Sequence, residues 1–553
     1  MKSFVIKKIT PLKSHLNTTI FFLLFLLSGS LSAKTSYFFY VQLANKNGSP
    51  YSLSNPSAYL SERAIARRAF FRIACDSTDL PISPFYTSQI ESIGANIHCR
   101  SKWMNGVTVL ISDSNIMKQV RALPFVKWVQ YTGKRDVALP PSAKTKAEIT
   151  TLNYGSANVQ INQINGSYFH SAGYTGQGIV IGVLDAGFTN VNVNHAFDSL
   201  RLQGRLLGIK DIAEPNSNIY SLDEHGADVL SIMTGNLPGK YLGTAPNASY
   251  WLIRTEYSPT EYLVETDFWT SGIEFADSVG VDVVNSSLVY TEFDDPSLNF
   301  TYNDMNGKVS RASRAATLAS KKGIIVCNSV GNYGSSLWQY LGSPADADGI
   351  ITIGAVTSIG SSSDFSSFGP SYDGRVKPEI CALGSSTVFV NKNGSVSMGN
   401  GTSYSSPVIA GTVACLIQAL KETNSHFDIE SIRTLLIQSA SAYPNPTDQL
   451  GYGIPDFDKV LKYLNFYNSK KTEFASFEVN YDARDKAIHL VMFNNSETTE
   501  KIAHIYSIIG CKIVEKTITG TITILPVPKM TSGIYLVCIS ENGKLESKKI
   551  IVP

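Results

Sequence analysis

Cysteine is scarce in this chain, with seven among 553 residues. Even in an oxidising compartment, this density excludes a small scaffold that depends on disulfides for its stability. The sequence also lacks a CxxC pair and any cluster of histidine and cysteine, which disfavours a zinc enzyme. Cys327 lies in an apolar run and is interpreted as a small core residue.

Long apolar runs are lacking after the first 33 residues, so no membrane crossing is predicted there. Residues 1–33 combine four lysines, an apolar run at residues 20–27 and small residues up to Ala33. This order predicts a cleaved secretory signal peptide, with an uncleaved anchor as the alternative. We therefore expect an exported protein without a transmembrane segment after signal removal.

A strong charge of one sign is missing too, because 47 Lys and Arg nearly balance 45 Asp and Glu. The charges are unevenly placed, however. Residues 36–135 carry 12 Lys and Arg against 5 Asp and Glu, whereas residues 154–463 carry 17 against 29. These opposite net charges favour docking of the two segments on each other over nucleic-acid binding.

One stretch carries the chemistry around which the rest of the chain is arranged. Residues 399–407 read GNGTSYSSP and run into an apolar segment at residues 408–420. The pattern predicts a loop that delivers Ser403 to a helix N-terminus, where backbone N–H groups and the helix dipole favour negative charge. Ser403 is interpreted either as a helix N-cap or as a nucleophile whose oxyanion uses these N–H groups.

A nucleophilic serine needs a base, an orienting acid and an oxyanion donor, and each has a candidate. Asp185 ends the apolar run at residues 179–184, as expected at the C-terminal edge of a buried parallel strand. His225 begins a helical pattern, and Asn332 follows a second buried strand at residues 324–327. Each residue alone is a common strand cap, helix start or turn, but their joint occurrence favours catalysis.

The order Asp, His, Asn, Ser and the words around these residues resemble the subtilisin family of serine endopeptidases. Six features of that family occur in its order: DAG at residues 185–187, HGA at 225–227, GTAPNA at 243–248, the asparagine at 332, FSSFGP at 365–370 and GTSYSSP at 401–407. The first two words differ from the usual D-[ST]-G and H-G-T by the loss of a hydroxyl. Together the six features form a specific signal that covers residues 154–464.

The resemblance implies a serine endopeptidase that works through an acyl-enzyme intermediate and needs no cofactor for its chemistry. Ser403 would be the nucleophile, His225 its base and Asp185 the carboxylate that orients the histidine. The side-chain amide of Asn332 would bind the oxyanion together with the backbone N–H of Ser403.

Protein and peptide substrates are implied by the same resemblance. Ser287, Leu288 and Val289 resemble the family's strand that pairs with an extended substrate, and Gly331 precedes the oxyanion asparagine. Val289 stands where glycine is usual, so no subsite preference is carried over to this chain.

Metal binding is not located by the sequence. Glu261, Glu265 and Asp267 are interpreted as a solvated helix face, with a preference for basic peptides or calcium binding as alternatives. Structural calcium is frequent in the family, but no Asp-x-Asp-x-Asp loop marks a site.

The length and a composition of 43% hydrophobic and 17% charged residues suggest about three globular domains. In residues 154–464, alternating strand and helix patterns predict an α/β domain with a parallel sheet covered by helices on both faces, which the resemblance implies is the subtilisin fold. Residues 36–135 predict a small α+β domain, similar to the family's inhibitory propeptide; a substrate-binding accessory domain is the alternative. Residues 136–153 predict a cleavable linker.

Short β-rich runs in residues 472–553, separated by Asn, Gly and Ser, predict a small β-sandwich. GIYLV at residues 533–537 and KKIIV at residues 548–552 resemble the sorting domain of type IX secretion in the Bacteroidetes. That resemblance implies a secretion machinery as partner and a secreted or cell-surface location. A carbohydrate- or protein-binding sandwich is the alternative.

A second class of function competes with the enzyme. The chain would then be a catalytically inactive subtilisin-like scaffold that serves as a surface binding protein. All four chemical residues are retained, which favours the enzyme.

Overall fold

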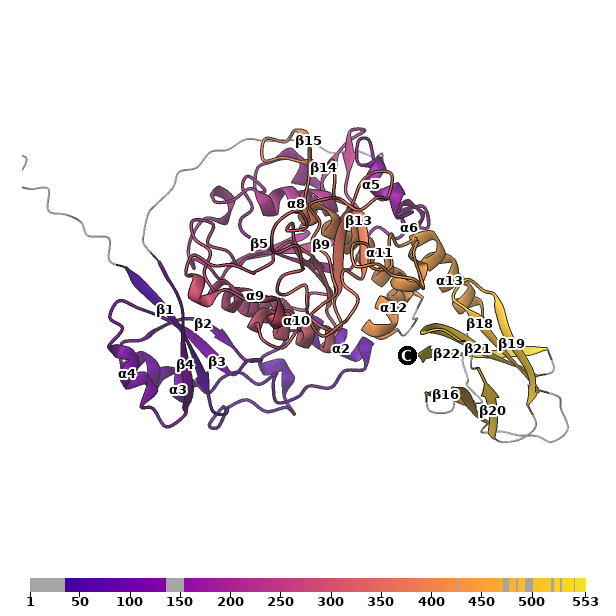
Figure 1. The fold of residues 1–553 in the computed structure, drawn as a ribbon, viewed down its shortest axis with the longest axis horizontal. Coiled ribbons are helices and arrows are strands. Elements are labelled where there is room, and N and C mark those ends of the chain that lie inside the picture. Colours follow the sequence, from indigo (N-terminus) through magenta and orange to yellow (C-terminus); the bar gives the residue numbers. More distant parts are fainter. Residues whose placement is uncertain are drawn as a thin grey trace, which may run out of the picture.

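The computed structural model describes residues 35–135, 154–423, 425, 427–470, 477–483, 486–492, 501–518, 522–527, 530–541 and 543–553. The predicted signal peptide at residues 1–33 and the predicted linker at residues 136–153 lie outside the described residues. Figure 1 shows three modules, of which the central one lies between an indigo N-terminal module and a yellow C-terminal module.

The central module is built on a seven-stranded sheet with the order β13-β12-β11-β10-β5-β9-β6. All neighbouring strands run parallel, which confirms the predicted parallel sheet. The strands are β5 (Val180–Asp185), β6 (Leu206–Asp211), β9 (Ser249–Arg254), β10 (Val283–Ser286), β11 (Ile325–Ser329), β12 (Ile351–Val356) and β13 (Ile380–Leu383). The edge strands β6 and β13 were not predicted, because β6 is partly exposed and the short apolar run of β13 directly follows Lys377, Pro378 and Glu379.

Helices cover both faces of this sheet, as predicted (Figure 1). One face packs against α8 (His225–Thr234) and α11 (Thr402–Glu422), and the other against α9 (Glu265–Val279) and α10 (Arg311–Lys321). The strands are buried on both sides because successive side chains point to opposite faces. Thus Val183 joins the first core and Leu184 the second.

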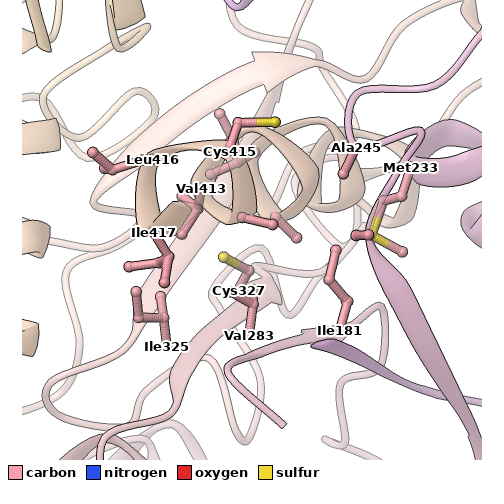
Figure 2. Packing of buried hydrophobic residues seen from close by; sticks show 14 of the residues in the cluster. Ile181, Met233, Ala245, Val283, Ile325, Cys327, Val413, Cys415, Leu416 and Ile417 are labelled. Carbon is pink, nitrogen blue, oxygen red and sulfur yellow. The ribbon is translucent and has the colours of Figure 1, made fainter. Parts of the chain in front are cut away.

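The long helix α11 lies in the centre of the first core. Figure 2 shows Cys327 on its strand below Val413 and Ile417 of the helix, and Cys327 is fully buried there. By length and composition α11 is able to span a membrane, which corrects the expectation that no later segment is apolar enough. Its apolar window is 89% buried inside the protein, as expected of a core helix.

Shorter elements complete the central module at its surface. They are α5 (Asn158–Gln163), α6 (Ser167–Ser171), η2 (His195–Phe197), α7 (Asp198–Leu202), η3 (Ile219–Ser221), β7 (Asn236–Leu237), β8 (Tyr241–Leu242), η4 (Pro296–Leu298), η5 (Tyr302–Asp304), β14 (Thr387–Val390), β15 (Val396–Gly399), α12 (Ile429–Ser439) and α13 (Phe457–Lys470). The β14–β15 hairpin packs against α8 through Val390, whose N–H donates to Ser231 Oγ.

The N-terminal module is the predicted small α+β domain, with an antiparallel sheet of order β2-β3-β1-β4. Its elements are β1 (Ser36–Leu43), η1 (Pro56–Ala58), α2 (Glu62–Phe71), α3 (Pro84–Ser92), β2 (Asn96–Ser101), β3 (Gly106–Ile111), α4 (Ile116–Arg121) and β4 (Val126–Arg135). Strand β2 and helix α3 were not predicted, because β2 lacks a regular alternation of apolar and polar residues and α3 lacks a clear apolar face.

Carboxylates on α9 hold the N-terminal module against the central one. The buried Asp277 accepts hydrogen bonds from Arg67 Nη2 (2.5 Å), Arg68 Nη2 (2.9 Å) and Lys102 Nζ (3.2 Å). One turn earlier, Glu274 accepts from Ser101 Oγ (2.5 Å) and from the Lys102 N–H (2.7 Å). Burial opposes ionisation of Asp277, but the three cations outweigh it and lower the pKa of its carboxyl. The opposite charges of the two segments therefore meet at this contact.

The C-terminal module is the predicted β-sandwich, in which the sheets β16-β17-β20 and β19-β18-β21-β22 share one core. The strands are β16 (Phe477–Asp482), β17 (Ala487–Met492), β18 (Lys501–Ser507), β19 (Lys512–Ile518), β20 (Ile522–Pro526), β21 (Gly533–Glu541) and β22 (Lys544–Val552). The sandwich contacts α12, where the Ile534 N–H donates to Gln438 Oε1 (3.0 Å) and Lys549 Nζ to Ser431 Oγ (2.7 Å).

Replacing Asp277 tests the contact between the first two modules. When the 36–135 segment and the central module are produced separately, Asp277→Asn should raise their dissociation constant by about 30-fold or more, because it leaves the buried guanidinium of Arg67 without the carboxylate that it pairs with. Added salt should mainly slow association, since exposed charges steer the encounter and buried pairs are screened less. Surface plasmon resonance measures both rates.

Asp373→Asn is the matched control, because Asp373 pairs with Arg375 inside the central module. Equal dissociation rates for the Asp277→Asn and Asp373→Asn proteins would contradict the role given to Asp277.

Candidate active site

The four predicted catalytic residues meet at the carboxyl edge of the parallel sheet. Asp185 is the last residue of β5, His225 the first of α8, and Ser403 the second of α11. Asn332 follows the end of β11 by three residues. Sites in open parallel sheets form at this edge because strand ends and helix starts lie next to one another there.

Asp185 and His225 are joined by a short hydrogen bond. Asp185 is fully buried, and its Oδ1 accepts from His225 Nδ1 (2.7 Å) and from the Ala186 N–H (2.8 Å). Its Oδ2 has no hydrogen-bond partner among the described residues. Ala186 stands where the family usually has Ser or Thr, so this position supplies no side-chain donor to Oδ2.

The charge of His225 is set by the carboxylates around it. The side chain of His225 is 32% exposed, and its backbone N–H donates to Asp223 Oδ1 (2.8 Å). Burial lowers the pKa of His225, but Asp185 above all, followed by Asp223 and Asp228, outweighs burial and raises this pKa to about 9. The surrounding carboxylates therefore stabilise the protonated, positively charged form of the ring.

Ser403 lies in the first turn of α11 and is 8% exposed. Its Oγ donates to the Ser287 carbonyl (3.4 Å), and its own carbonyl accepts from Ser287 Oγ (2.9 Å). The ring of the next residue, Tyr404, lies 6.3 Å from the His225 ring and stacks on Phe389 at 5.0 Å. The starts of α8 and α11 thus converge on one site.

Asn332 is oriented by the residue before the serine. Its Oδ1 accepts from the Thr402 N–H (2.9 Å) and from Thr402 Oγ1 (3.0 Å), and its Nδ2, on the other side of the amide, has no acceptor among the described residues. A Cβ atom on Gly401 would lie 3.7 Å from both Asn332 Nδ2 and the Ser403 nitrogen. Glycine therefore keeps a space open between two hydrogen-bond donors.

The predicted substrate-binding strand continues from β10. Within the described residues, the backbone N–H and C=O of Val289 have no hydrogen-bond partner, whereas Tyr290 pairs with Ser343 in both directions. The Leu288 carbonyl accepts from Asn328 Nδ2 (3.1 Å), so it is already engaged. Val289 is thus the position at which an extended chain can add to this edge.

Ser287 and Gly331 have structural roles beside the serine and the asparagine. Ser287 bridges to Ser403 through its hydroxyl and its carbonyl. Gly331 has φ +112°, and a side chain at this position would meet Ser367 Oγ at 2.9 Å. Only glycine suits that backbone conformation, which turns the chain toward Asn332.

The interpretation of Glu261, Glu265 and Asp267 as a solvated helix face is wrong for two of these residues. Glu265 is 2% exposed and Asp267 is 3% exposed. Asp267 forms an ion pair with Arg311 and accepts from Thr108 Oγ1 (3.0 Å) of the N-terminal module. Tertiary packing of the N-terminal module covers this end of α9, which a helical pattern does not reveal.

Glu265 instead joins Glu256 and Glu261 in a carboxylate cluster whose ligand atoms lie within 4.8 Å of one another. Burial, with a smaller contribution from Asp294, raises the pKa of Glu261 to about 7. Burial also raises the pKa values of Glu256 and Glu265 well above their usual range. The sequence analysis missed Glu256, although its place directly after β9 at the site edge was a usable signal.

Calcium needs six to eight oxygen ligands, of which this cluster supplies three carboxylates. Both oxygens of Glu265 already accept backbone N–H groups, from Tyr257 (2.8 Å) and Tyr262 (3.1 Å). The cluster therefore does not form a complete calcium cage, and structural calcium stays a prediction without a located site.

Three family models match this chain. They are the subtilase family at residues 176–453, the peptidase S8 propeptide domain of Bacteroidota at residues 38–149 and the secretion system C-terminal sorting domain at residues 486–553. The first match covers just over half of the 553 residues, so the chain belongs to the subtilase family. It is a subtilisin-like serine endopeptidase with a propeptide domain and a sorting tail.

Individual relatives are similar over about half of this chain or more. Subtilisin NAT of Bacillus subtilis subsp. natto is 25% identical over 332 residues, which cover 59% of this chain and 74% of the relative. Subtilisin DY of Bacillus licheniformis is 28% identical over 270 residues, 48% of this chain and 85% of the relative. A solved structure of a mutant protease domain of PatA is 21% identical, covers 53% of this chain and 96% of its own, and has a TM-score of 0.42.

The raised pKa of His225 predicts an alkaline enzyme. Only the neutral imidazole takes a proton from serine, so kcat/KM should fall about tenfold for each pH unit below a midpoint near pH 9. Hydrolysis of a chromogenic peptide between about pH 6 and about pH 11 measures this acid limb. A midpoint near 6.5, the ordinary value of the histidine pKa, would contradict the influence of the surrounding carboxylates.

Proposed function

We propose that this subtilase is a secreted or cell-surface endopeptidase whose catalytic triad is Asp185, His225 and Ser403, with Asn332 as oxyanion donor. The observation that carries the proposal is the 2.7 Å bond from His225 Nδ1 to a fully buried Asp185, beside a serine in the first turn of α11. This arrangement provides a base, its orienting acid and a nucleophile at one sheet edge.

The bond to Asp185 determines which nitrogen of His225 acts as the base. Nδ1 carries the proton that it donates to Asp185, so Nε2 is left to accept the proton of Ser403 Oγ. Oγ then attacks the peptide carbonyl, and the imidazolium passes its proton to the leaving amine as the C–N bond breaks. Water repeats the same steps on the acyl-enzyme, which releases the carboxylic acid and restores Ser403.

The carbonyl oxygen gains a negative charge during both attacks. Asn332 Nδ2 and the Ser403 N–H flank the open space beside Gly401 and would donate to this oxyanion. The free backbone groups of Val289 would pair with the substrate chain and hold its carbonyl over Ser403. The chemistry then needs only the chain's own groups.

We assign the modules as a signal peptide at residues 1–33, a propeptide at 36–135, a linker at 136–153, the catalytic domain at 154–464 and a sorting domain at 472–553. The propeptide role is supported by the position of β4. Near its end, the Thr132 carbonyl accepts from the Val264 N–H (2.8 Å), and the Arg135 guanidinium lies 4.2 Å from the Tyr257 ring. The last residues of the propeptide therefore lie against the loop between β9 and α9, which carries Glu256 and Glu261.

Ser403→Ala tests both catalysis and maturation. It should abolish turnover of an unstructured protein such as casein and leave a precursor that is uncut between about residues 134 and 153. The fold should survive, because such a change at a helix start costs about 0.5–2 kcal/mol even if the hydroxyl caps the helix. Asn332→Ala should reduce turnover by about 10²–10³ and slow the trimming without stopping it.

Precursor length by mass spectrometry, read beside casein turnover, separates the outcomes. Full turnover by the Ser403→Ala protein would exclude Ser403 as the nucleophile. A dead but normally trimmed protein would show that another protease removes the propeptide.

Removing residues 472–553 tests the sorting domain. The sandwich has its own core, so the truncated enzyme should keep its fold and its activity but remain in the periplasm. Cell fractionation followed by casein assay of each fraction measures the distribution. Normal amounts of truncated enzyme at the surface or in the medium would refute this role.

The rival function, an inactive binding scaffold, is distinguished by a fluorophosphonate probe. Such probes form a covalent bond only with an activated serine, so labelling that depends on Ser403 and His225 supports the enzyme.

A further inference from the structure

A buried carboxylate that has no role in the triad lies one helical turn beyond His225. Asp228 is 8% exposed, and its Oδ1 has no hydrogen-bond partner among the described residues. Residues three apart on a helix lie on the same face, so Asp228 and His225 are neighbours on α8. The i, i+3 spacing was visible in the sequence, but the burial and the missing partner were not.

An unpaired buried carboxylate is costly unless an opposite charge lies nearby. The charged and titratable groups around His225 and Asp228 are Asp185 from β5, Asp223 and Glu224 before α8, Tyr241 from β8, Lys392 from the β14–β15 loop, and Tyr404 from α11. Lys392 is engaged at the surface, where it forms an ion pair with Glu224. Of the two cations in this set, His225 lies on the same face of α8 as Asp228, whereas Lys392 lies at the surface.

We propose that Asp228 is a second carboxylate for the catalytic histidine, a positioning residue that stabilises the imidazolium of His225 while it holds the proton of Ser403. The proposal rests on the triad assigned above. Asp185 orients His225 through a hydrogen bond, whereas Asp228 acts through the field of its buried charge.

The charge of Asp228 itself depends on pH. Burial, followed by the nearby Glu224, raises the pKa of Asp228 to about 7. A raised carboxyl pKa means that the group is neutral below about pH 7 and charged above it. Asp228 therefore supports the imidazolium only at the alkaline pH at which the enzyme works.

The test compares the pH profiles of kcat/KM for the activated full-length enzyme and for Asp228→Asn. Neutral asparagine should lower the midpoint of the acid limb by about one pH unit and lower the alkaline plateau, because the imidazolium loses one nearby charge. The two curves should approach each other below about pH 6, where Asp228 is protonated as well. Asp228→Glu should return the midpoint most of the way to its wild-type value, since glutamate carries the same charge.

Asp348→Asn is the matched control, because it removes one charge ahead of β12, at the opposite edge of the sheet. It should leave the midpoint unchanged. Asp228→Ser is a second neutral variant, and the rate of fluorophosphonate labelling against pH gives the same midpoint without turnover.

An active Asp228→Asn or Asp228→Ser enzyme with the wild-type midpoint would overturn the proposal. So would a loss of activity that is equal at every pH, since that is the mark of a structural role. Failure of the triad itself has a different signature, because the wild-type protein would then not be labelled through Ser403.

Discussion

The hydrogen bond between Asp185 and His225 is the constraint on which the catalytic arrangement depends. A fully buried carboxylate is tolerated only with donors nearby, and His225 Nδ1 is one of the two that the structure provides. The bond therefore connects the end of the interior strand β5 to the start of α8. Because α11 packs against α8 and against the same face of the sheet, Ser403 is brought to this edge by the core itself.

Helix α9 links this site to the propeptide. Its inner face packs on the sheet, while Glu274 and Asp277 on its outer face bind the N-terminal module. At its start, Glu265 belongs to the carboxylate cluster with Glu256 and Glu261, and Asp267 accepts a hydrogen bond from the propeptide residue Thr108. Three carboxylates of this helix, Asp267, Glu274 and Asp277, therefore contact the propeptide directly.

Acidic groups surround His225 and also line the surface of α9 that binds the propeptide. At the propeptide contact they are matched by arginine and lysine, which keeps the pKa of Asp277 low. Around His225 they exceed the cations, and their field raises the pKa of the histidine instead. The effect of the acidic groups on a neighbouring pKa therefore depends on whether cations of the N-terminal module pair with them, as at Asp277, or not, as around His225.

The sequence by itself determined the fold class, the three modules and the residue types of the site. Parallel strands buried on both faces are continuous apolar runs, which the sequence shows directly. The residues around Asp185, His225 and Ser403 form short sequence motifs that are recognisable without a structure. Short or half-exposed elements such as β6 and β13 carried no such signal. Only the tertiary structure decided that Glu265 and Asp267 are buried, and that Asp185 Oδ2 and Asp228 Oδ1 have no hydrogen-bond partner in the part of the chain that the structure describes. Burial and hydrogen bonding depend on segments distant in the chain, so no local pattern contains them.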